Sequence, residues 1–413
     1  MSFLQHSIIW QVYPLSADLR QLKAAADNQP TGSSQPERSG ENSSQALTLA
    51  RLEHWLDYLV NLGCDTLLLG PIFDSVSHGY DTTDHYRIDP RLGTDHDIDS
   101  LISQCHRRGV RLILDGVFNH VAASHPMVNY DGPIKRDDSG NPVGWEGHDE
   151  LVELNHQDPR TEDFVAEIME YWLQRGIDGW RLDVAYAVPR EFWAAVVDRV
   201  RQQYPHAVFL GEMIHGDYIE LIHQGHLDSA TQYELWKAIW SSIKDRNFWE
   251  LAHALERHHD FSQQAILNIF VGNHDVDRIA SIVGDGGAAL AASILFSLPG
   301  CPSIYYGDEQ AFRGLKGEGF GADDPIRPAL PDYPEHLAQE GQWLWQVYHD
   351  LIALRRRHSW LSTASVEVKD KDNESISYRL SAPEGFLDVH IDIRDKFRAD
   401  WEFNDGEELH YSW

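Results

Sequence analysis

Three acidic residues, each just after a short apolar run, are the first candidates for chemistry in this sequence. Asp183 ends GWRLD, Glu212 ends VFLGE and Asp275 follows IFVGNH. Arg181 lies two positions before Asp183, and residues i and i+2 of a strand point to the same side. A cation within about 4–6 Å lowers the pKa of a carboxyl by roughly 1–3 units, so we expect Arg181 to orient Asp183 and keep it ionised.

Glu212 has a different local sequence. Leu210, Gly211, Met213 and Ile214 flank it, and no basic residue lies within two positions. Apolar surroundings raise the pKa of a carboxyl, so we expect Glu212 to stay protonated and to serve as a general acid. A charged carboxylate beside a protonated carboxyl is the pair that retaining glycoside hydrolysis requires, at a separation of about 5–5.5 Å.

A repeated pattern of amphipathic helix, glycine and short apolar strand indicates how these residues could be positioned. It spans residues 49–70, 101–120 and 164–183. In the first copy the apolar residues recur at helical spacing, and Gly63 stands where a helix C-cap is expected. Strands that are apolar on both faces are typical of parallel sheets covered by helices.

The pattern predicts eight strands in total. The candidate strands are 7–13, 65–70, 111–116, 179–183, 207–211, 228–232, 266–271 and 301–306. Eight parallel strands alternating with helices favour an α/β protein with a closed (β/α)8 TIM barrel, and an open doubly wound sheet is the alternative. The sixth strand is the least distinct, because its sequence could also begin a helix. The carboxyl ends of barrel strands form the active-site face, so the acidic residues should converge there.

The chain divides into a barrel and two smaller parts. We expect the catalytic barrel at residues 1–120 and 159–360. Glycines and prolines predict a short insertion at 121–158, after the third strand, and alternating apolar residues predict a small C-terminal antiparallel β domain at 361–413. The polar composition of residues 24–46 predicts a flexible loop.

The composition limits which binding partners and which cellular compartment are compatible with the sequence. The formal charge of −31 argues against nucleic acid or an anionic membrane, because phosphate-binding surfaces need clustered Lys and Arg. Cys64, Cys105 and Cys301 lie in apolar segments, which predicts free buried thiols in a reducing compartment. The first residues do not resemble a secretory signal, and no run of 18 apolar residues occurs. We therefore expect a cytoplasmic protein of undetermined oligomeric state.

Several motifs in order resemble the α-amylase family of glycoside hydrolases, family 13. They are DGVFNH, GWRLDVAYA, FLGEMI and VGNHD, with HGYDTTDHY before them and PGCPSIYYGDE after them. The resemblance runs from residue 8 to about residue 330 and implies that Asp183 is the nucleophile, Glu212 the acid/base and Asp275 the third carboxylate. The substrate-binding positions it implies are Tyr80 (a stacking platform), Asp81, His120, Arg181, His274, Asp324 and Arg327, the last two as a donor-subsite pair.

The resemblance implies a retaining α-glycoside hydrolase that cleaves α-glucosidic bonds in malto-oligosaccharides or α-glucans through a β-glycosyl intermediate on Asp183. An α-glucosyl transferase, or an enzyme that processes sucrose- or trehalose-type disaccharides, would share the first half-reaction. A catalytically silent binding subunit is the third interpretation, and the three intact carboxyl residues speak against it. Linkage, chain length and endo or exo action are not indicated.

Two positions depart from the family pattern. Tyr186 and Ala187 stand where many α-amylases have Lys and His, which serve an acceptor subsite and a calcium site. The acceptor side is therefore altered, and the usual calcium site is in doubt although Asn119 is present. We expect no metal and no other cofactor.

Overall fold

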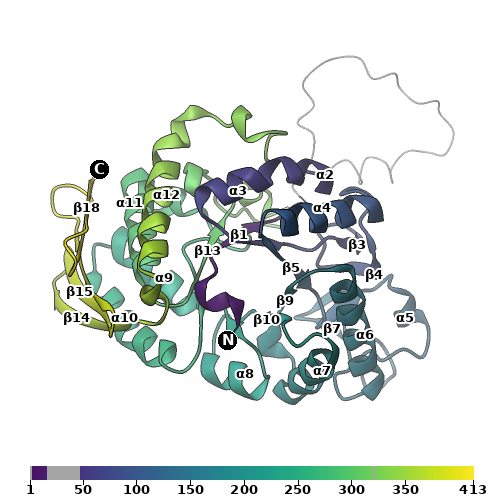
Figure 1. The fold of residues 1–413 in the computed structure, drawn as a ribbon. Helices are drawn as coiled ribbons and strands as arrows, with labels where there is room; N and C mark the ends of the chain where they lie inside the picture. The colour runs from purple at the N-terminus through teal and green to yellow at the C-terminus, as the bar shows by residue number, and fades with distance from the viewer. Residues whose placement is uncertain (1, 16–46, 320) are drawn as a thin grey trace.

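The computed structural model describes residues 2–15, 47–319 and 321–413 (Figure 1). The flexible loop predicted at 24–46 lies outside the described residues. Figure 1 shows the main body as a ring of strands surrounded by helices, with a separate sheet at the C-terminus.

Eight parallel strands form the ring. In chain order they are β1 (Ile9–Val12), β2 (Thr66–Leu69), β5 (Arg111–Gly116), β9 (Gly179–Leu182), β10 (Val208–Gly211), β11 (Ser229–Ala230), β12 (Asn268–Phe270) and β13 (Cys301–Tyr305). Hydrogen bonds join them in the order β11-β10-β9-β5-β2-β1-β13-β12, and a bridge between Thr231 and Asn268 joins the two outer strands. The predicted (β/α)8 barrel is confirmed. The sixth strand, β11, is two residues long, which explains its indistinct sequence.

The outer layer consists of helices of very different lengths. They are α2 (Leu49–Leu52), η2 (Glu53–Trp55), α3 (Leu56–Leu62), α4 (Asp95–Arg107), α6 (Pro159–Arg175), α7 (Arg190–Gln203), α8 (Tyr218–Gln224), α9 (Tyr233–Lys244), α10 (Phe248–Ser262), α11 (Ile279–Ser297) and α12 (Gln342–Arg357). Short turns of helix include η1 (Phe3–His6), η3 (Ala185–Ala187), η4 (Asp308–Gln310) and η5 (Asp324–Ile326).

Helix α6 shows how the sequence sets such an element. The Asp158 side chain accepts a hydrogen bond from the N–H of Arg160, and Pro159 occupies the first helical position, where no N–H is needed. Val165, Ile168, Met169 and Trp172 form its buried stripe at helical spacing. Gly176 ends the helix with φ of 113°, a left-handed conformation that favours glycine.

The barrel interior changes character along the strands. Ile9, Leu68, Ile113, Leu210 and Cys301 belong to one buried apolar cluster inside the ring. Alternate residues of a strand share a face, so the next inward positions lie two residues further on. Those that carry polar side chains are Gln11, Asp115, Glu212 and Ser303, all buried. An apolar layer thus lies beneath a polar layer at the carboxyl ends.

Two smaller sheets flank the barrel. Between β5 and α6 lie β6 (His120–Ala122), β7 (Gly144–Trp145) and β8 (His148–Glu153), paired antiparallel in the order β6-β8-β7, with α5 (Pro126–Asn129) in the connection. The hairpin of β3 (Phe73–Ser75) and β4 (Thr82–Ile88) follows β2. These segments extend the loops at the carboxyl ends of two barrel strands.

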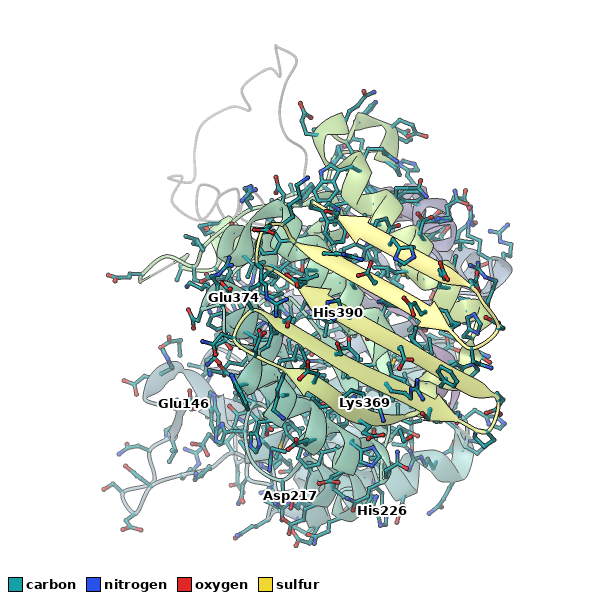
Figure 2. The ribbon with its side chains drawn as sticks, turned by 90° about the vertical axis from the view of Figure 1, so that its left-hand side faces the viewer. Glu146, Asp217, His226, Lys369, Glu374 and His390 are labelled. Atoms are coloured by element: carbon teal, nitrogen blue, oxygen red, sulfur yellow. The ribbon has the colours of Figure 1, made fainter. Side chains whose placement is uncertain are left out.

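The C-terminal sheet has five antiparallel strands. They are β14 (Ser365–Lys371), β15 (Ser375–Ala382), β16 (Gly385–Asp392), β17 (Arg398–Phe403) and β18 (Glu408–Ser412). Figure 2 shows its outward face, which carries Lys369 and His390. The other face packs on the barrel, where β14 contacts α10 and β17 contacts α11. The sheet therefore covers helices rather than the carboxyl ends of the strands.

The cysteines and the most apolar helix both lie in the interior of the protein. Cys64, Cys105 and Cys301 are buried free thiols, as predicted. Within the described chain, α11 alone is long and apolar enough to cross a membrane by length and composition, and 67% of its apolar window is buried inside the structure. Such burial is typical of a core helix.

Arg355, a buried residue of α12, ties three elements together. Its guanidinium donates hydrogen bonds to the carbonyl oxygens of Phe296, Leu298 and Gly300, with N···O distances between 2.7 and 3.0 Å. Burial lowers the pKa of Arg355 to about 10. These bonds fix the chain where α11 turns into β13.

We expect Arg355→Leu to lower the free energy of unfolding by about 3 kcal/mol, because three buried carbonyls would lose their donors. Urea titration followed by circular dichroism measures the change. The control is Arg357→Leu, whose side chain is 54% exposed in its ion pair with Glu407 and should cost less than about 1 kcal/mol. Equal losses in the two variants would contradict this role for Arg355.

Candidate active site

One guanidinium at the carboxyl ends of the strands holds three carboxyl groups. Arg181 Nη1 lies 2.8 Å from Asp115 Oδ1 and 2.9 Å from Asp183 Oδ1, and its Nη2 lies 2.6 Å from Glu212 Oε1. All four residues are buried. The strands β5, β9 and β10 are neighbours in the barrel, so their inward side chains at the same level meet.

The structure corrects the expected environment of Glu212. Its sequence neighbours are apolar, but Arg181 reaches it from the adjacent strand, and the N–H of Val184 donates to Oε2 at 2.8 Å. Local sequence alone does not show a partner that belongs to another strand.

The expected pKa of Asp183 needs correction, whereas that of Glu212 is raised as expected. Burial raises the pKa of Asp183 well above its usual range, although Arg181 acts in the opposite direction, so the predicted lowering was wrong. Burial likewise raises the pKa of Glu212, again against Arg181. Three carboxyl groups around one cation, with water excluded, therefore hold protons to a higher pH than free carboxyls do.

Asp275 is the most open of the predicted acidic residues. Its side chain is 34% exposed and contacts Arg327 Nη2 and His274 Nε2, each at 3.1 Å. Burial acts to raise the pKa of Asp275, but His274 and Arg327 outweigh it, so the pKa is lowered. Asp275 is thus the carboxylate of the site that is best kept ionised.

A cluster of three nearly parallel aromatic rings forms one wall of the site. The His274 ring lies 5.7 Å from the Tyr13 ring and 5.5 Å from the Tyr80 ring, and the two tyrosine rings are 6.4 Å apart, so the three centroids form a triangle. The Tyr80 hydroxyl donates to Asp115 Oδ2 at 3.0 Å and contacts His274 Nε2. Tyr80 is therefore hydrogen-bonded to the carboxyl cluster as well as being a flat surface.

His120 supports this wall from behind. Its Nε2 lies 3.0 Å from the Tyr80 carbonyl oxygen, and its Nδ1 lies 3.2 Å from Asn119 Nδ2. Its ring stacks on Trp145 of β7 at 6.4 Å. Burial lowers the pKa of His120 to about 4, so the ring is neutral near pH 7.

Asp81 acts on the loop rather than on the carboxyl cluster. Its carboxylate accepts hydrogen bonds from the Ser77 hydroxyl and from the N–H groups of His78 and Gly79. These bonds shape the turn that presents Tyr80. The substrate-binding role expected for Asp81 stays a prediction.

Arg327 lies in the site beside Asp275, and the donor-subsite role expected for Asp324 and Arg327 stays a prediction. It pairs with Asp275 at 3.1 Å and with Asp323 at 2.9 Å, and its guanidinium lies 4.3 Å from the centre of the Tyr13 ring. Asp324 begins η5, and its backbone carbonyl accepts from the Arg327 N–H. Asp323, one residue earlier, supplies the ion pair.

Several side chains of the site were given no role from the sequence. Asp115, near the end of the third strand in DGVFNH, was recognised as a polar strand-end residue but not as a partner of Arg181. Tyr233, whose hydroxyl lies 3.5 Å from Glu212 Oε1, starts a helix and gives no such signal. Asn273 donates to the Tyr233 hydroxyl at 2.7 Å.

Asn119 is the residue that the resemblance associates with a calcium site. Its Nδ2 lies 3.2 Å from His120 Nδ1, and no three His, Cys, Asp or Glu side chains within the described residues gather to hold a metal ion. Calcium prefers six to eight oxygen ligands. No step derived below passes through a metal.

This arrangement belongs to a known family. Residues 41–138 and 145–342 match the family model described as the α-amylase catalytic domain. The chain belongs to the α-amylase family of glycosidases. The α-amylase match covers the barrel strands from β2 to β13, including every strand that contributes to the Arg181 cluster.

Relatives within the α-amylase family have several activities. The chain is 30% identical to a cyclomaltodextrinase of Geobacillus thermopakistaniensis over 77% of this chain and 57% of the relative. It is 28% identical to α-amylase 3 of Dictyoglomus thermophilum over 86% of this chain and 81% of the relative. The chain therefore spans less than two thirds of the length of the cyclomaltodextrinase.

Solved structures share the whole fold. A cyclic α-maltosyl-(1→6)-maltose hydrolase from Arthrobacter globiformis superposes with a TM-score of 0.80 at 24% identity, over 100% of this chain and 99% of that one. That hydrolase has also been solved in complex with cyclic α-maltosyl-(1→6)-maltose and with maltose. At this identity the likeness supports the fold alone.

Val184 has a strained backbone at the centre of the site. Its φ of 49° and ψ of 36° lie in the left-handed region, which a β-branched residue adopts at a cost of about 1–3 kcal/mol. In this conformation its N–H points at Glu212 Oε2. The strain therefore accompanies a hydrogen bond to the acid/base candidate.

We expect Val184→Gly to raise the free energy of unfolding by about 1 kcal/mol, because glycine adopts this conformation without strain and keeps the N–H. Val188→Gly is the control in the same loop. Val188 is 3% exposed with an ordinary φ of −91°, so the change should cost about 2 kcal/mol or more. Urea titration measures both, and a destabilised Val184→Gly protein would contradict the assignment of strain.

We expect Asp183→Asn to be more stable than the wild type at about pH 7, by about 1–3 kcal/mol. Because the pKa of Asp183 is raised in the folded chain, its ionisation opposes folding above the unfolded pKa of about 3.9, and the gain should vanish near pH 4. Asp275→Asn should have the opposite sign, since the pKa of Asp275 is lowered and its charge stabilises the fold at neutral pH. Urea titrations across this pH range test both signs, and a destabilising Asp183→Asn at pH 7 would contradict the account.

Proposed function

We propose that this protein is a retaining α-glycoside hydrolase that cleaves α-glucosidic bonds in malto-oligosaccharides or α-glucans. The observation that supports this best is the sharing of Arg181 by Asp183 and Glu212, which holds two carboxyl groups side by side at the carboxyl ends of adjacent strands. Asp275 completes the acidic set on the more open side.

In the first step the ionised carboxylate of Asp183 attacks the anomeric carbon, and the bond to the leaving oxygen breaks as Glu212 transfers its proton to that oxygen. The reactive form therefore has Asp183 ionised and Glu212 protonated, and the raised pKa of Asp183 places the formation of this form at a higher pH than a free aspartate would. Arg181 Nη1 fixes one oxygen of Asp183, which leaves the other carboxylate oxygen to form the new bond. The raised pKa of Glu212 favours the protonated form that donates this proton. The product of this step is a β-glycosyl ester.

In the second step Glu212, now ionised, takes a proton from water as the water oxygen attacks the anomeric carbon. The ester bond breaks, and Asp183 is released as a carboxylate. Two inversions give an α-product with net retention of configuration. The Val184 N–H and Arg181 Nη2 each hold one oxygen of Glu212 in its charged form.

The remaining polar groups bind sugar hydroxyls. Asp275 presents an acceptor on the exposed side beside the buried His274 ring, and Arg327 holds the carboxylate in place. The stack of Tyr80 on His274 offers a flat surface for the apolar face of a pyranose ring. The net charge of −31 suits a neutral substrate such as an α-glucan better than an anionic one.

A glucosyl transferase is the second candidate, and Tyr186 favours it. Tyr186 and His215 follow Asp183 and Glu212 by three residues each, and their rings lie 5.3 Å apart. An aromatic surface beside the acid/base can bind an acceptor sugar, which then competes with water in the second step. Product analysis distinguishes the two functions.

We expect Asp183→Ala to lower kcat/KM for release of reducing sugar from maltoheptaose by about 10⁴-fold or more, because no ester can form. Asp138→Ala, at an exposed position of the insertion, is the control and should keep activity within about twofold. Chromatography of products from maltoheptaose, maltose, pullulan, sucrose and trehalose distinguishes hydrolysis from transfer. If the wild-type protein cleaves none of these α-glucosides, the proposal is wrong.

A further inference from the structure

A chain of hydrogen bonds runs behind the sugar-facing wall of the site. Gln11, an inward residue of β1, places its Nε2 3.1 Å from His274 Nδ1, and both residues are buried. On the other side of the ring, His274 Nε2 contacts the Tyr80 hydroxyl and lies 3.1 Å from Asp275 Oδ2. The Tyr80 hydroxyl in turn donates to Asp115 Oδ2 at 3.0 Å.

The directions of these bonds depend on one another. Burial lowers the pKa of His274 to about 3, so the ring is neutral and has one N–H and one lone pair. An amide nitrogen only donates, so Gln11 requires the lone pair of His274 at Nδ1. The ring proton then lies on Nε2, where it faces two oxygen atoms, those of Tyr80 and Asp275.

The opposite tautomer would disturb every later bond of the chain. With the proton on Nδ1, the lone pair at Nε2 would face the Asp275 carboxylate and would compete for the Tyr80 proton. Asp115 would then lose its hydrogen bond from Tyr80 and retain Arg181. The observed distances are consistent with a single direction, from Gln11 through His274 and Tyr80 to Asp115.

We propose that Gln11 is a positioning residue that fixes His274 as the Nε2–H tautomer. The ring thereby presents one N–H donor on the substrate side, while Asp275 beside it presents an acceptor. This pair matches a sugar hydroxyl, which accepts one hydrogen bond and donates another. The assignment of the tautomer stands on the contacts alone, and its kinetic consequence rests on the proposed function.

The tautomer is measured directly by long-range ¹H–¹⁵N spectroscopy of protein labelled at histidine nitrogens, with His274→Gln identifying the signals. We expect a protonated Nε2 and an unprotonated Nδ1 in the wild type. In Gln11→Glu the carboxylate accepts instead of donating, so Nδ1 should become protonated. An Nδ1–H tautomer in the wild type, or an unchanged His274 in Gln11→Glu, would overturn the proposal.

The matched control is a second buried glutamine that faces a histidine. Gln232 Oε1 lies 2.7 Å from His258 Nδ1, so this glutamine presents an acceptor, and His258 Nε2 lies 3.1 Å from the Pro299 carbonyl. Gln232→Glu introduces the same buried carboxylate beside a histidine outside the hydrogen-bond chain, but it leaves an acceptor at the contact, whereas Gln11→Glu replaces a donor by an acceptor. It should leave the His274 signals unchanged and keep kcat/KM within about twofold, and a shift of His274 here would overturn the specific role of Gln11.

Kinetics test the consequence for catalysis. We expect Gln11→Met, which keeps the side-chain volume, and Gln11→Glu each to lower kcat/KM for maltotriose by about 10–100-fold. Gln11→Glu should add an ionisation to the pH profile, because a buried carboxylate raises the pKa of the neighbouring imidazole. The charged and titratable groups that also act on His274 are Tyr13, Tyr80, Asp115, Arg181, Asp275, Lys316 and Arg327.

The outcomes separate this inference from the proposed function. If the wild type hydrolyses maltotriose and both Gln11 variants, folded as judged by their melting temperatures, keep kcat/KM within about twofold, the positioning role is refuted. If the wild type is inactive on all α-glucosides, the proposed function fails, and the spectra still decide the tautomer.

Discussion

The site depends on one buried guanidinium, which contacts three carboxyl groups although its single positive charge can balance only one negative charge. Arg181 contacts Asp115, Asp183 and Glu212 with water excluded, so removal of the cation would leave three buried acids without a partner. Burial of an isolated carboxylate lowers the free energy of unfolding by several kcal/mol, and in the barrel three carboxyl groups are buried together around Arg181. The excess negative charge makes protons available near neutral pH, and acid/base chemistry needs them there.

The period of two along a strand links this cluster to the fold. Apolar side chains such as Ile113 and Leu210 fill the lower interior, and the residues two positions later, Asp115 and Glu212, form the polar layer above it. The same rule places Gln11 above Ile9. Packing and chemistry are thus encoded in alternate positions of the same strands, and the helices outside serve to hold those strands in register.

Sequence patterns predict the strands of the barrel well, because an apolar run between helix and loop is a local signal. Asp183, Glu212 and Asp275 were also found, since each follows such a run. The pairing of Arg181 with Glu212 and of Arg327 with Asp323 was not, because these contacts join strands or loops that only the closed barrel brings together. The direction of the pKa shift was predicted for Glu212 but not for Asp183, because the pKa of Asp183 depends on burial and on neighbours from other strands as well as on Arg181.

The barrel closes between β11 and β12, where the strand pairing is weaker than elsewhere in the ring. A single backbone bridge, Thr231 to Asn268, joins β11 to β12, whereas β9 and β10 share four paired positions. Tyr233 and Asn273 follow these two strands and contact each other, and the Tyr233 hydroxyl reaches Glu212. Fewer main-chain bonds must break to part the wall here than elsewhere. Amide hydrogens at this seam should therefore exchange with solvent sooner than those of β5 and β9, and transient widening of the mouth would begin on the side that holds the proton donor.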